Sequence, residues 1–192
     1  MWLVEQLKEE WFQEGDEYTY ENLVDFAMDA EPFSSIIDPD NALFIRPGPM
    51  SGRIQDYCRA NDQPVPNNQA QLLRSVFDSL ACKYRIVLEQ LASFTSKPLT
   101  ELRVVGGGSK NHFLNQCTAN ALNCQVNAGP VEATSLGNVL MQMHGNGQIE
   151  SLAAGRHLVE QSFTSDSYQS ENPDAWIEPV ERLKHLISNQ NG

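Results

Sequence analysis

A run of three glycines near the middle of the chain constrains the fold more than any other stretch. Residues 102–114 read LRVVGGGSKNHFL, so that a short apolar run meets the glycines and a helical pattern follows them. This order predicts a strand, a tight turn and a helix. Glycine lets the backbone approach a ligand closely, and the helix start behind it offers unpaired N–H groups and the positive end of the helix dipole. Such a turn suits a nucleotide, although a plain strand–helix turn has the same pattern.

The spacing of the glycines matches neither the dinucleotide fingerprint G-x-G-x-x-G nor the P-loop. The residues alone therefore leave other functions open. One alternative is a dinucleotide-binding module of an oxidoreductase, but the second predicted strand, QVNA at 125–128, lacks the acidic residue that would hold the ribose. The other alternative is a non-catalytic helical interaction domain, favoured by the number of helices and the acidity of the chain. In that case the glycine turn would be structural.

Composition excludes several classes of partner. The net charge of −12 argues against nucleic acid or an anionic membrane surface, because few cations would neutralise the phosphates. No apolar run approaches the ~20 residues that a membrane span requires. The four cysteines show no C-x-x-C spacing and no histidine in ligand register, which favours reduced thiols in a cytoplasmic protein and no metal site. A redox pairing of Cys117 with Cys124 stays open.

The periodicity predicts a helix-rich α/β chain with a small sheet. Helices are expected over 1–13, 21–30, 51–60, 69–94, 109–122, 132–143, 149–158 and 174–187, and strands over 101–105 and 125–128. The segments 31–50 and 61–68 are expected to be irregular, with 43–45 as a short strand or core plug, and 161–172 is expected to be extended. Ser109 is expected to cap the helix behind the glycines. The longest helix carries an apolar stripe that we expect in the core, formed by Leu73, Val76, Phe77, Leu80, Tyr84, Val87, Leu88 and Leu91.

The start of the chain and the strand count point to a piece of a longer protein. The sequence opens inside an amphipathic helix that no capping residue precedes, and Trp2 in that helix is expected to be core. Two strands cannot satisfy the edges of a sheet by themselves. We therefore expect the missing strands to come from sequence that is absent here.

The titratable residues show no catalytic motif. The aspartates without a partnering motif are expected to be turn formers or solvated surface charges, and these are Asp16, Asp38, Asp40, Asp56 and Asp78. The histidines have no nucleophile signature nearby. Lys110 is close enough to the glycines to approach a phosphate, but a lone lysine at a helix start is also typical of a solvated surface. No residue of this chain is therefore expected to act as a base.

Residues 103–142, RVVGGGSKNHFLNQCTANALNCQVNAGPVEATSLGNVLMQ, resemble the nucleotide-binding segment of the FGGY carbohydrate kinases. The glycine turn, the Asn after it, the Phe-Leu pair, the Gly-Pro-Val-Glu-Ala-Thr run and the following Leu-Gly-Asn agree in order and spacing. The opening MWLVEQL and the stretch IRPGPMSGRIQDYC at 45–58 also resemble that family. The resemblance therefore spans nearly the whole chain.

The resemblance implies a fold and a reaction. The family is built from two actin-like, ribonuclease-H-like lobes around a cleft, so residues 1–192 would be a single domain, most of the C-terminal, nucleotide-binding lobe, with a truncated sheet. The implied reaction transfers the γ-phosphoryl group of ATP, with Mg²⁺, to a sugar hydroxyl, here of the ketose L-rhamnulose to give its 1-phosphate. The catalytic base would lie in the N-terminal lobe of the same full-length chain. The chain by itself is then expected to be inactive, with no catalytic residue and no metal ligand of its own.

The resemblance also implies a set of nucleotide-binding residues. Gly107 matches the glycine whose backbone touches the nucleotide, and Asn111 matches the residue at its adenosine end. Gly106 and Gly108 would shape the same turn. Glu5 falls where relatives often carry a glutamine near the nucleotide, and an acidic side chain at that place would repel the phosphates.

Overall fold

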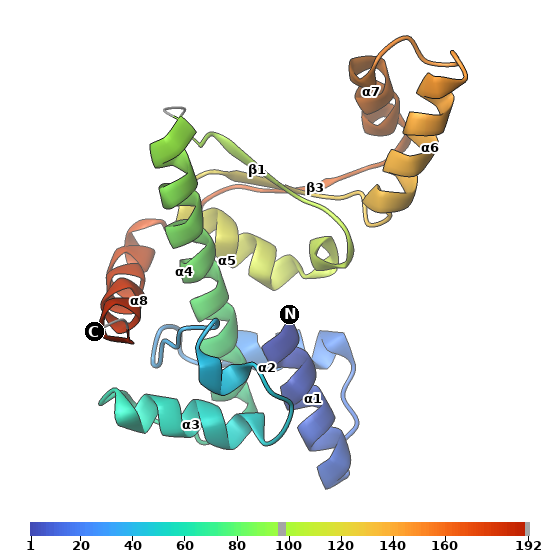
Figure 1. Cartoon of the computed structure of the whole chain (residues 1–192). Coiled ribbons are helices and arrows are strands. Elements are labelled where there is room, and N and C mark those ends of the chain that lie inside the picture. The colour runs from blue at the N-terminus through green and yellow to red at the C-terminus, as the bar shows by residue number, and fades with distance from the viewer. Residues whose placement is uncertain (96–98, 191–192) are drawn as a thin grey trace.

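A computed structural model describes residues 1–95 and 99–190 of the chain. Within these ranges the chain forms eight α-helices and three strands (Figure 1). The helices are α1 (Trp2–Glu14), α2 (Tyr20–Asp29), α3 (Met50–Ala60), α4 (Gln69–Thr95), α5 (His112–Leu122), α6 (Ala133–Gly145), α7 (Leu152–Ser162) and α8 (Ile177–Gln190). The strands are β1 (Glu101–Val104), β2 (Gln125–Ala128) and β3 (Asp166–Tyr168). The predicted helix-rich α/β fold with a small sheet is confirmed.

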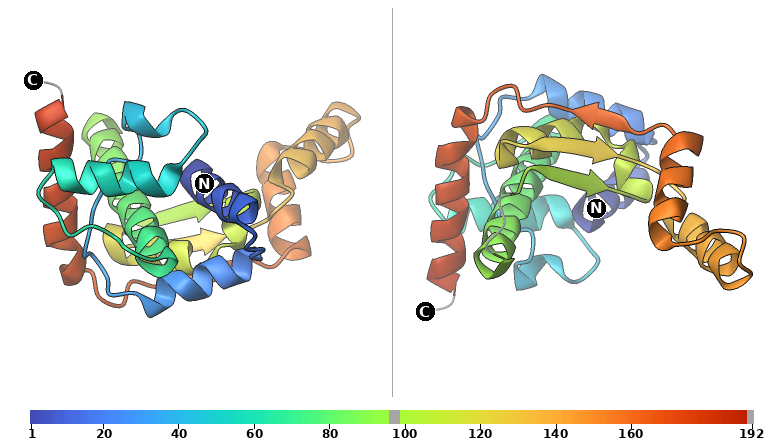
Figure 2. Two further views of the ribbon diagram at one scale, coloured as in Figure 1. Left: turned by 90° about the horizontal axis from the view of Figure 1, so that it is seen from below. Right: turned by 90° about the horizontal axis from the view of Figure 1, so that it is seen from above.

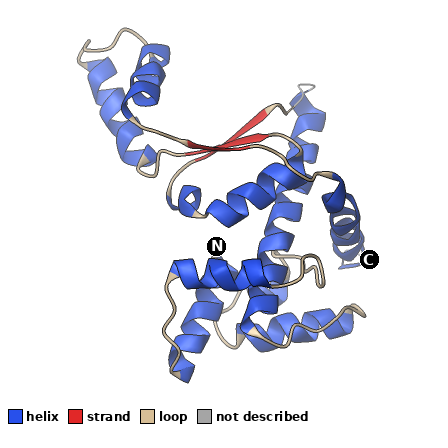
Figure 3. Cartoon of the chain, turned by 180° about the vertical axis from the view of Figure 1, so that it is seen from behind, coloured by secondary structure: helices blue, strands red, loops and turns tan. Residues whose placement is uncertain are grey.

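The three strands, red in Figure 3, form one mixed sheet whose order is β1-β2-β3. Strand β1 runs parallel to β2, with Leu102 opposite Val126. Strand β3 is antiparallel to β2 and places Tyr168 opposite Val126. The two strands expected from the sequence are thus confirmed, and the polar stretch 161–172 adds a third. The connection from β1 to β2 passes through the glycine turn and α5, so the turn lies at the end of a strand that leads directly into a helix.

Helix α4 is the centre of the core, with α2, α5 and α8 packed along it (Figure 2). The first part of the predicted stripe is buried, because α2 covers the N-terminal half of α4; Phe77 there meets the ring of Phe113 edge to face, with centroids 5.6 Å apart. For Tyr84, Val87 and Leu91, which follow in the same stripe, the prediction of burial is wrong. Tyr84 and Val87 are exposed and Leu91 is 53% exposed, so α5 and α8, which pack on α4, leave these side chains uncovered.

Two of the aspartates that were predicted to lie on the surface, Asp38 and Asp78, are buried and bound by cationic or N–H groups. The carboxylate of Asp78 is bound by Arg74 and by the backbone N–H of Phe33, at 2.8 Å. Asp38 lies 2.9 Å from the ammonium group of Lys83 on α4. The irregular segment 31–50 is therefore fastened to α4 by polar contacts rather than by regular structure.

Inside that segment, 43–45 is not a strand, and the expectation of a core plug is confirmed for Phe44 alone. Residues Ala42–Phe44 form one turn of 3₁₀ helix that buries Phe44 and leaves Leu43 and Ile45 exposed. Trp2, expected in the core, is 45% exposed and donates a hydrogen bond of 2.7 Å from its Nε1 to the carbonyl oxygen of Phe44. This bond fixes the start of α1 against the segment.

Helices α6 and α7 form a hairpin that projects away from α1, α2 and α3 (Figure 1). None of the side chains of α6 is buried. Helix α7 begins at Leu152 rather than at Ile149 because the hydroxyl of Ser151 accepts a hydrogen bond from the backbone N–H of Ala154 and caps it. Across residues 1–95 and 99–190, no helix combines the length and the apolar character that crossing a membrane requires.

All four cysteines are free and buried, so the pairing of Cys117 with Cys124 is not formed. Burial raises the pKa of the Cys117 thiol to about 12 and that of the Cys58 thiol to about 11. Thiols held in this state are poor nucleophiles and poor metal ligands. The cysteines therefore belong to the core.

Candidate functional site

The glycine turn is held by two hydrogen bonds at the backbone of Gly106, one with Pro130 and one with the side chain of Ser109. Gly106 has a φ of +77°, a conformation that favours glycine, and its N–H donates to the carbonyl oxygen of Pro130 at 3.2 Å. The hydroxyl of Ser109 donates to the carbonyl oxygen of Gly106 at 2.6 Å. Ser109 is thus buried inside the turn. The prediction that it caps the helix is wrong. The turn Gly107–Lys110 is a 3₁₀ helix, and α5 starts only at His112.

Asn111 takes the capping role instead. Its Oδ1 accepts a hydrogen bond of 2.9 Å from the backbone N–H of Leu114. The residue is only 7% exposed, and its Nδ2 is buried without a hydrogen-bond partner among the described residues. A buried donor left unpaired costs roughly 1–3 kcal/mol, so native structures rarely keep one without a reason. An acceptor atom from a ligand would satisfy it.

The front of the turn is open. Gly107 and Gly108 are exposed, whereas Gly106 is half-buried. A Cβ atom added to Gly107 would meet no atom within 4 Å, and one added to Gly108 would lie 3.9 Å from a methyl carbon of Val104. The protein itself therefore does not require glycine at 107 for space. A group that needs the bare backbone there has to come from outside the described chain.

A cavity of about 750 Å³ adjoins this open face. Its size lies in the range of small-molecule sites. Helices α1 and α2 form one wall and the glycine turn with the start of α5 forms the other. The lining residues are Met1, Glu5, Tyr20, Glu21, Val24, Asp25, Gly107, Gly108, Lys110, Asn111 and His112. The structure thus brings together four of the five predicted site residues, Glu5, Gly107, Gly108 and Asn111, and leaves Gly106 behind the turn.

The two walls of the cavity differ in charge. Glu5, Glu21 and Asp25 make the α1–α2 wall acidic. Lys110 stands on the other wall and has no ion-pair partner within 4.0 Å in the described part of the chain. Its neighbour His112 is bonded through Nδ1 to the hydroxyl of Tyr168 at 2.5 Å. A ligand with an anionic end would therefore point that end toward Lys110.

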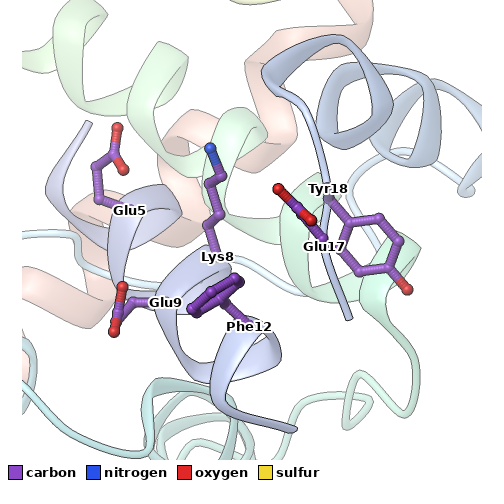
Figure 4. Close-up of a pocket in the computed structure, with 6 residues that line it drawn as sticks. All are labelled: Glu5, Lys8, Glu9, Phe12, Glu17 and Tyr18. Atoms are coloured by element: carbon purple, nitrogen blue, oxygen red, sulfur yellow. The ribbon is translucent and has the colours of Figure 1, made fainter. Parts of the chain in front are cut away.

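Glu5 stands where two cavities meet. Its Oε1 accepts a hydrogen bond of 2.9 Å from the hydroxyl of Tyr20. On its other side, Glu5 lines a second cavity of about 320 Å³ together with Lys8, Glu9, Phe12, Glu17 and Tyr18 (Figure 4). Burial, reinforced by the hydrogen bond to Glu5, raises the pKa of Tyr20 above its usual value. The tyrosine therefore stays protonated and donates the bond at neutral pH.

Sequence reasoning missed the α2 wall of the larger cavity. Tyr20, Glu21, Val24 and Asp25 belong to a short amphipathic helix without any motif, far from the glycines in sequence. Only tertiary folding brings them opposite the turn. Within the ranges 1–95 and 99–190, no three histidine, cysteine or acidic side chains are grouped so that they could hold a metal ion.

Residues 1–145 match the family model described as the C-terminal domain of the FGGY family of carbohydrate kinases. A rhamnulokinase of Bacteroides thetaiotaomicron is 42% identical over 187 residues, which cover 97% of this chain and 38% of that protein. A rhamnulokinase of Enterococcus faecalis is 39% identical, with 92% of this chain and 36% of that protein covered. The chain therefore spans little more than a third of the length of these curated relatives.

Solved structures share the fold at low sequence identity. A ligand-bound xylulose kinase of Lactobacillus acidophilus superimposes with a TM-score of 0.65 at 16% identity, over 93% of this chain and 36% of that one. A glycerol kinase of Plasmodium falciparum, solved with ADP, gives a TM-score of 0.61 at 16% identity, over 90% of this chain and 33% of that one. Neither alternative class, oxidoreductase module or helical interaction domain, is supported. The chain belongs to the FGGY family of carbohydrate kinases and corresponds to their C-terminal domain.

Proposed function

We propose that this chain is the ATP-binding part of a kinase that phosphorylates L-rhamnulose to L-rhamnulose 1-phosphate. The observation that carries the proposal is Asn111, which lines a cavity beside the exposed backbone of Gly107 and whose buried Nδ2 has no acceptor among the described residues. The sugar is inferred from the relatives, which are rhamnulokinases. The relatives are much longer than this chain, so the sugar is inferred from them and from no contact described here.

The residues at the turn fit a nucleotide. The exposed backbone of Gly107 and Gly108 allows close approach, and Nδ2 of Asn111 can donate to a ring nitrogen or an oxygen of the ligand. Lys110 provides a local positive charge in a chain of net charge −12. Gly106 shapes the turn without lining the cavity. Glu5 faces the same cavity from α1, so we place it near the nucleotide as well.

Phosphoryl transfer depends on positioning and on neutralising charge over the transferred oxygens. A bound Mg²⁺ would supply part of that neutralisation. Magnesium is usually held by one or two carboxylates, waters and the substrate phosphates. Among the described residues, the carboxylates that line the cavity are those of Glu5, Glu21 and Asp25, and all three lie on the α1–α2 wall, opposite Lys110. We therefore propose that Mg²⁺ enters with the phosphates and that its other protein contacts lie outside the chain.

The catalytic base is also proposed to lie outside. The buried aspartates of the chain already have structural partners, Asp78 with Arg74 and Asp38 with Lys83. A carboxylate paired in this way is not available to take a proton from a sugar hydroxyl. The N-terminal lobe of the full-length protein is therefore the partner that completes the cleft, and the chain alone transfers no phosphoryl group.

We further propose that residues 1–192 form one domain, with residues 103–142 as its nucleotide-binding segment. The part beyond the family match supports this, because β3 pairs with β2 and α8 packs on α4. The four free cysteines support a reducing compartment, and we infer the cytoplasm.

The test is a titration of the 192-residue chain with ATP, followed by amide chemical shifts in NMR so that weak binding is measurable. Wild type is compared with Asn111→Ser and Gly107→Val. Serine is as good a helix cap as asparagine, so Asn111→Ser should keep its melting temperature while binding ATP about tenfold more weakly. Gly107→Val should fold, since no atom lies within 4 Å of the new Cβ, and should lose binding.

The matched control is Gly137→Val on α6, where a Cβ also meets nothing within 4 Å and which lies outside the cavity. It should bind ATP like wild type. Absence of ATP-induced shifts at the turn, or equal affinity in Gly107→Val and wild type, would contradict the proposal. Tighter binding of NADH than of ATP would favour a dinucleotide module instead. Phosphorylation of L-rhamnulose by the purified chain would show that the base is present after all.

A further inference from the structure

We propose that Tyr20 is a positioning residue that holds Glu5 in place. Glu5 then accepts a hydrogen bond from a donor on the nucleoside end of the ligand, so that the α1–α2 wall of the cavity selects that end. The inference rests on the proposed function, because it concerns the ligand of the same cavity. It adds a residue from α2 and a basis for nucleotide choice.

Tyr20 is fixed by the start of its helix. Thr19 caps α2 with a reciprocal pair of bonds, in which its Oγ1 accepts from the N–H of Asn22 at 3.2 Å and its own N–H donates to Oδ1 of Asn22 at 3.0 Å. The ammonium group of Lys8 lies 5.7 Å from the centre of the Tyr20 ring. The phenol is thereby held at one place, from which it reaches Oε1 of Glu5.

Glu5 is fixed from its own helix as well. The bond from Trp2 to the carbonyl oxygen of Phe44 anchors the first turn of α1. With Oε1 of Glu5 bound to Tyr20, Oε2 has no partner among the described residues. A carboxylate is an acceptor only, so the free oxygen can bind a donor and repels phosphate. Glu21 and Asp25 add negative charge to the same wall.

The polarity of the cavity therefore orients the ligand. Phosphates are favoured near Lys110 and disfavoured near Glu5, so the group that faces Glu5 is the nucleoside. Two donors on adenosine fit an acceptor there, the 6-amino group of the base and a ribose hydroxyl. A purine with a 6-oxo group would present an acceptor to the carboxylate and lose the first contact. Both cases share one chemistry, a neutral donor bound by Glu5.

The experiment measures dissociation constants of ATP, ITP and 2′-deoxy-ATP for the 192-residue chain by the same NMR titration. The variants are Glu5→Gln, which removes the charge, and Tyr20→Phe, which removes only the hydroxyl. Since hydrogen bonds to charged groups are among the strong ones, wild type should bind ATP about tenfold more tightly than one of the two analogues. Both variants should reduce that ratio to about threefold or less.

Matched controls make the same chemical changes elsewhere. Glu9→Gln removes a charge one turn along α1 at a residue that lines only the smaller cavity, and Tyr84→Phe removes a hydroxyl from the exposed side of α4. Both should keep the wild-type ratio. If the variants lose the preference for ATP over ITP, the donor bound by Glu5 is the 6-amino group. If they lose the preference for ATP over 2′-deoxy-ATP, the donor is the ribose hydroxyl.

Three outcomes would overturn the inference while leaving ATP binding intact. Both analogues could bind as tightly as ATP in wild type. The ratio could stay unchanged in Glu5→Gln. Tyr20→Phe could weaken ATP and both analogues by the same factor, which would make Tyr20 merely structural. If instead wild type binds no nucleotide, or Gly107→Val binds ATP with the affinity of wild type, the proposed function itself fails.

Discussion

Arg74 and Asp78 face each other across one turn of α4, with Nε of the arginine 2.9 Å from Oδ1 and 3.0 Å from Oδ2 of the aspartate. The side chain of Asp78 is completely buried, and that of Arg74 is nearly so. The guanidinium also donates to the carbonyl oxygens of Ala27 and Ala30 at the end of α2. Because α2 forms part of the acidic wall of the cavity, this pair connects the candidate site to the core.

Removing one partner should be costly. Asp78→Ala leaves the buried guanidinium without its counter-charge, so we expect the free energy of unfolding to fall by about 3–5 kcal/mol, measured by urea denaturation. The control is Asp56→Ala, whose carboxylate pairs with Arg59 but is 76% exposed, and its effect should stay within about 1 kcal/mol. Similar losses in the two variants would show that burial of the pair does not matter.

The two halves of α4 should respond differently to the same substitution. Leu73 is fully buried, so Leu73→Ala should lower the free energy of unfolding by about 2–5 kcal/mol. Leu91 belongs to the same predicted stripe but is exposed, so Leu91→Ala should change it by less than about 0.5 kcal/mol. A large loss for Leu91→Ala would mean that in solution something covers this side of the helix.

Acid should weaken the contact between α4 and α8. Glu89 lies 2.8 Å from Arg85 and 3.0 Å from Lys184 of α8. Partial burial raises the pKa of Glu89, but the hydrogen bonds and charges of these two cations outweigh burial and hold it below its ordinary value of 4.5. The folded state therefore favours the carboxylate. The stabilisation is fully present above the pKa of the unfolded chain and is lost as the pH falls through the folded value.

The measurement compares wild type with Glu89→Gln by urea denaturation at several pH values. Because the carboxylate is 43% exposed and screened by solvent, the difference in unfolding free energy should be only about 0.5 kcal/mol at pH 7. It should vanish below the folded pKa. Glu150→Gln, at an exposed position, serves as the control and should show no such trend. A difference that grows on acidification would contradict the sign of the shift.

Local patterns predicted the elements well where each element is defined by its own residues. The apolar run before the glycines gave β1, and the periodicity behind them gave α5, because strand and helix each need only their own period. The sequence predicted Ser109 as the helix cap, whereas the structure has Asn111. Both residue types cap helices, and only the 3₁₀ turn between them decides where α5 begins. The exposure of Leu91 was not predictable, because an apolar stripe does not reveal what covers it.

The lining of the cavity was predictable for the glycine turn, for Asn111 and for Glu5 on α1, but not for α2. The glycine turn and Asn111 carry a motif, whereas Tyr20 and Asp25 have none and reach the cavity through the packing of α2 on α4. Buried Asp78 shows the same limit, because its partners Arg74 and Phe33 come together only in the folded chain. A polar residue in a sequence is expected on the surface until its partners are known.

Gly106 and Gly107 should differ sharply although they are neighbours. Gly106 has a φ of +77°, so Gly106→Ala forces a strained backbone and should lower the free energy of unfolding by about 1–2 kcal/mol. Gly107 has no positive φ and open space at its Cβ, so Gly107→Ala should leave stability unchanged or raise it by up to about 1 kcal/mol. Thermal and urea denaturation of the two variants measure this. A larger loss for Gly107→Ala than for Gly106→Ala would mean that the turn has another conformation, and that the glycine at 107 serves the fold rather than a ligand.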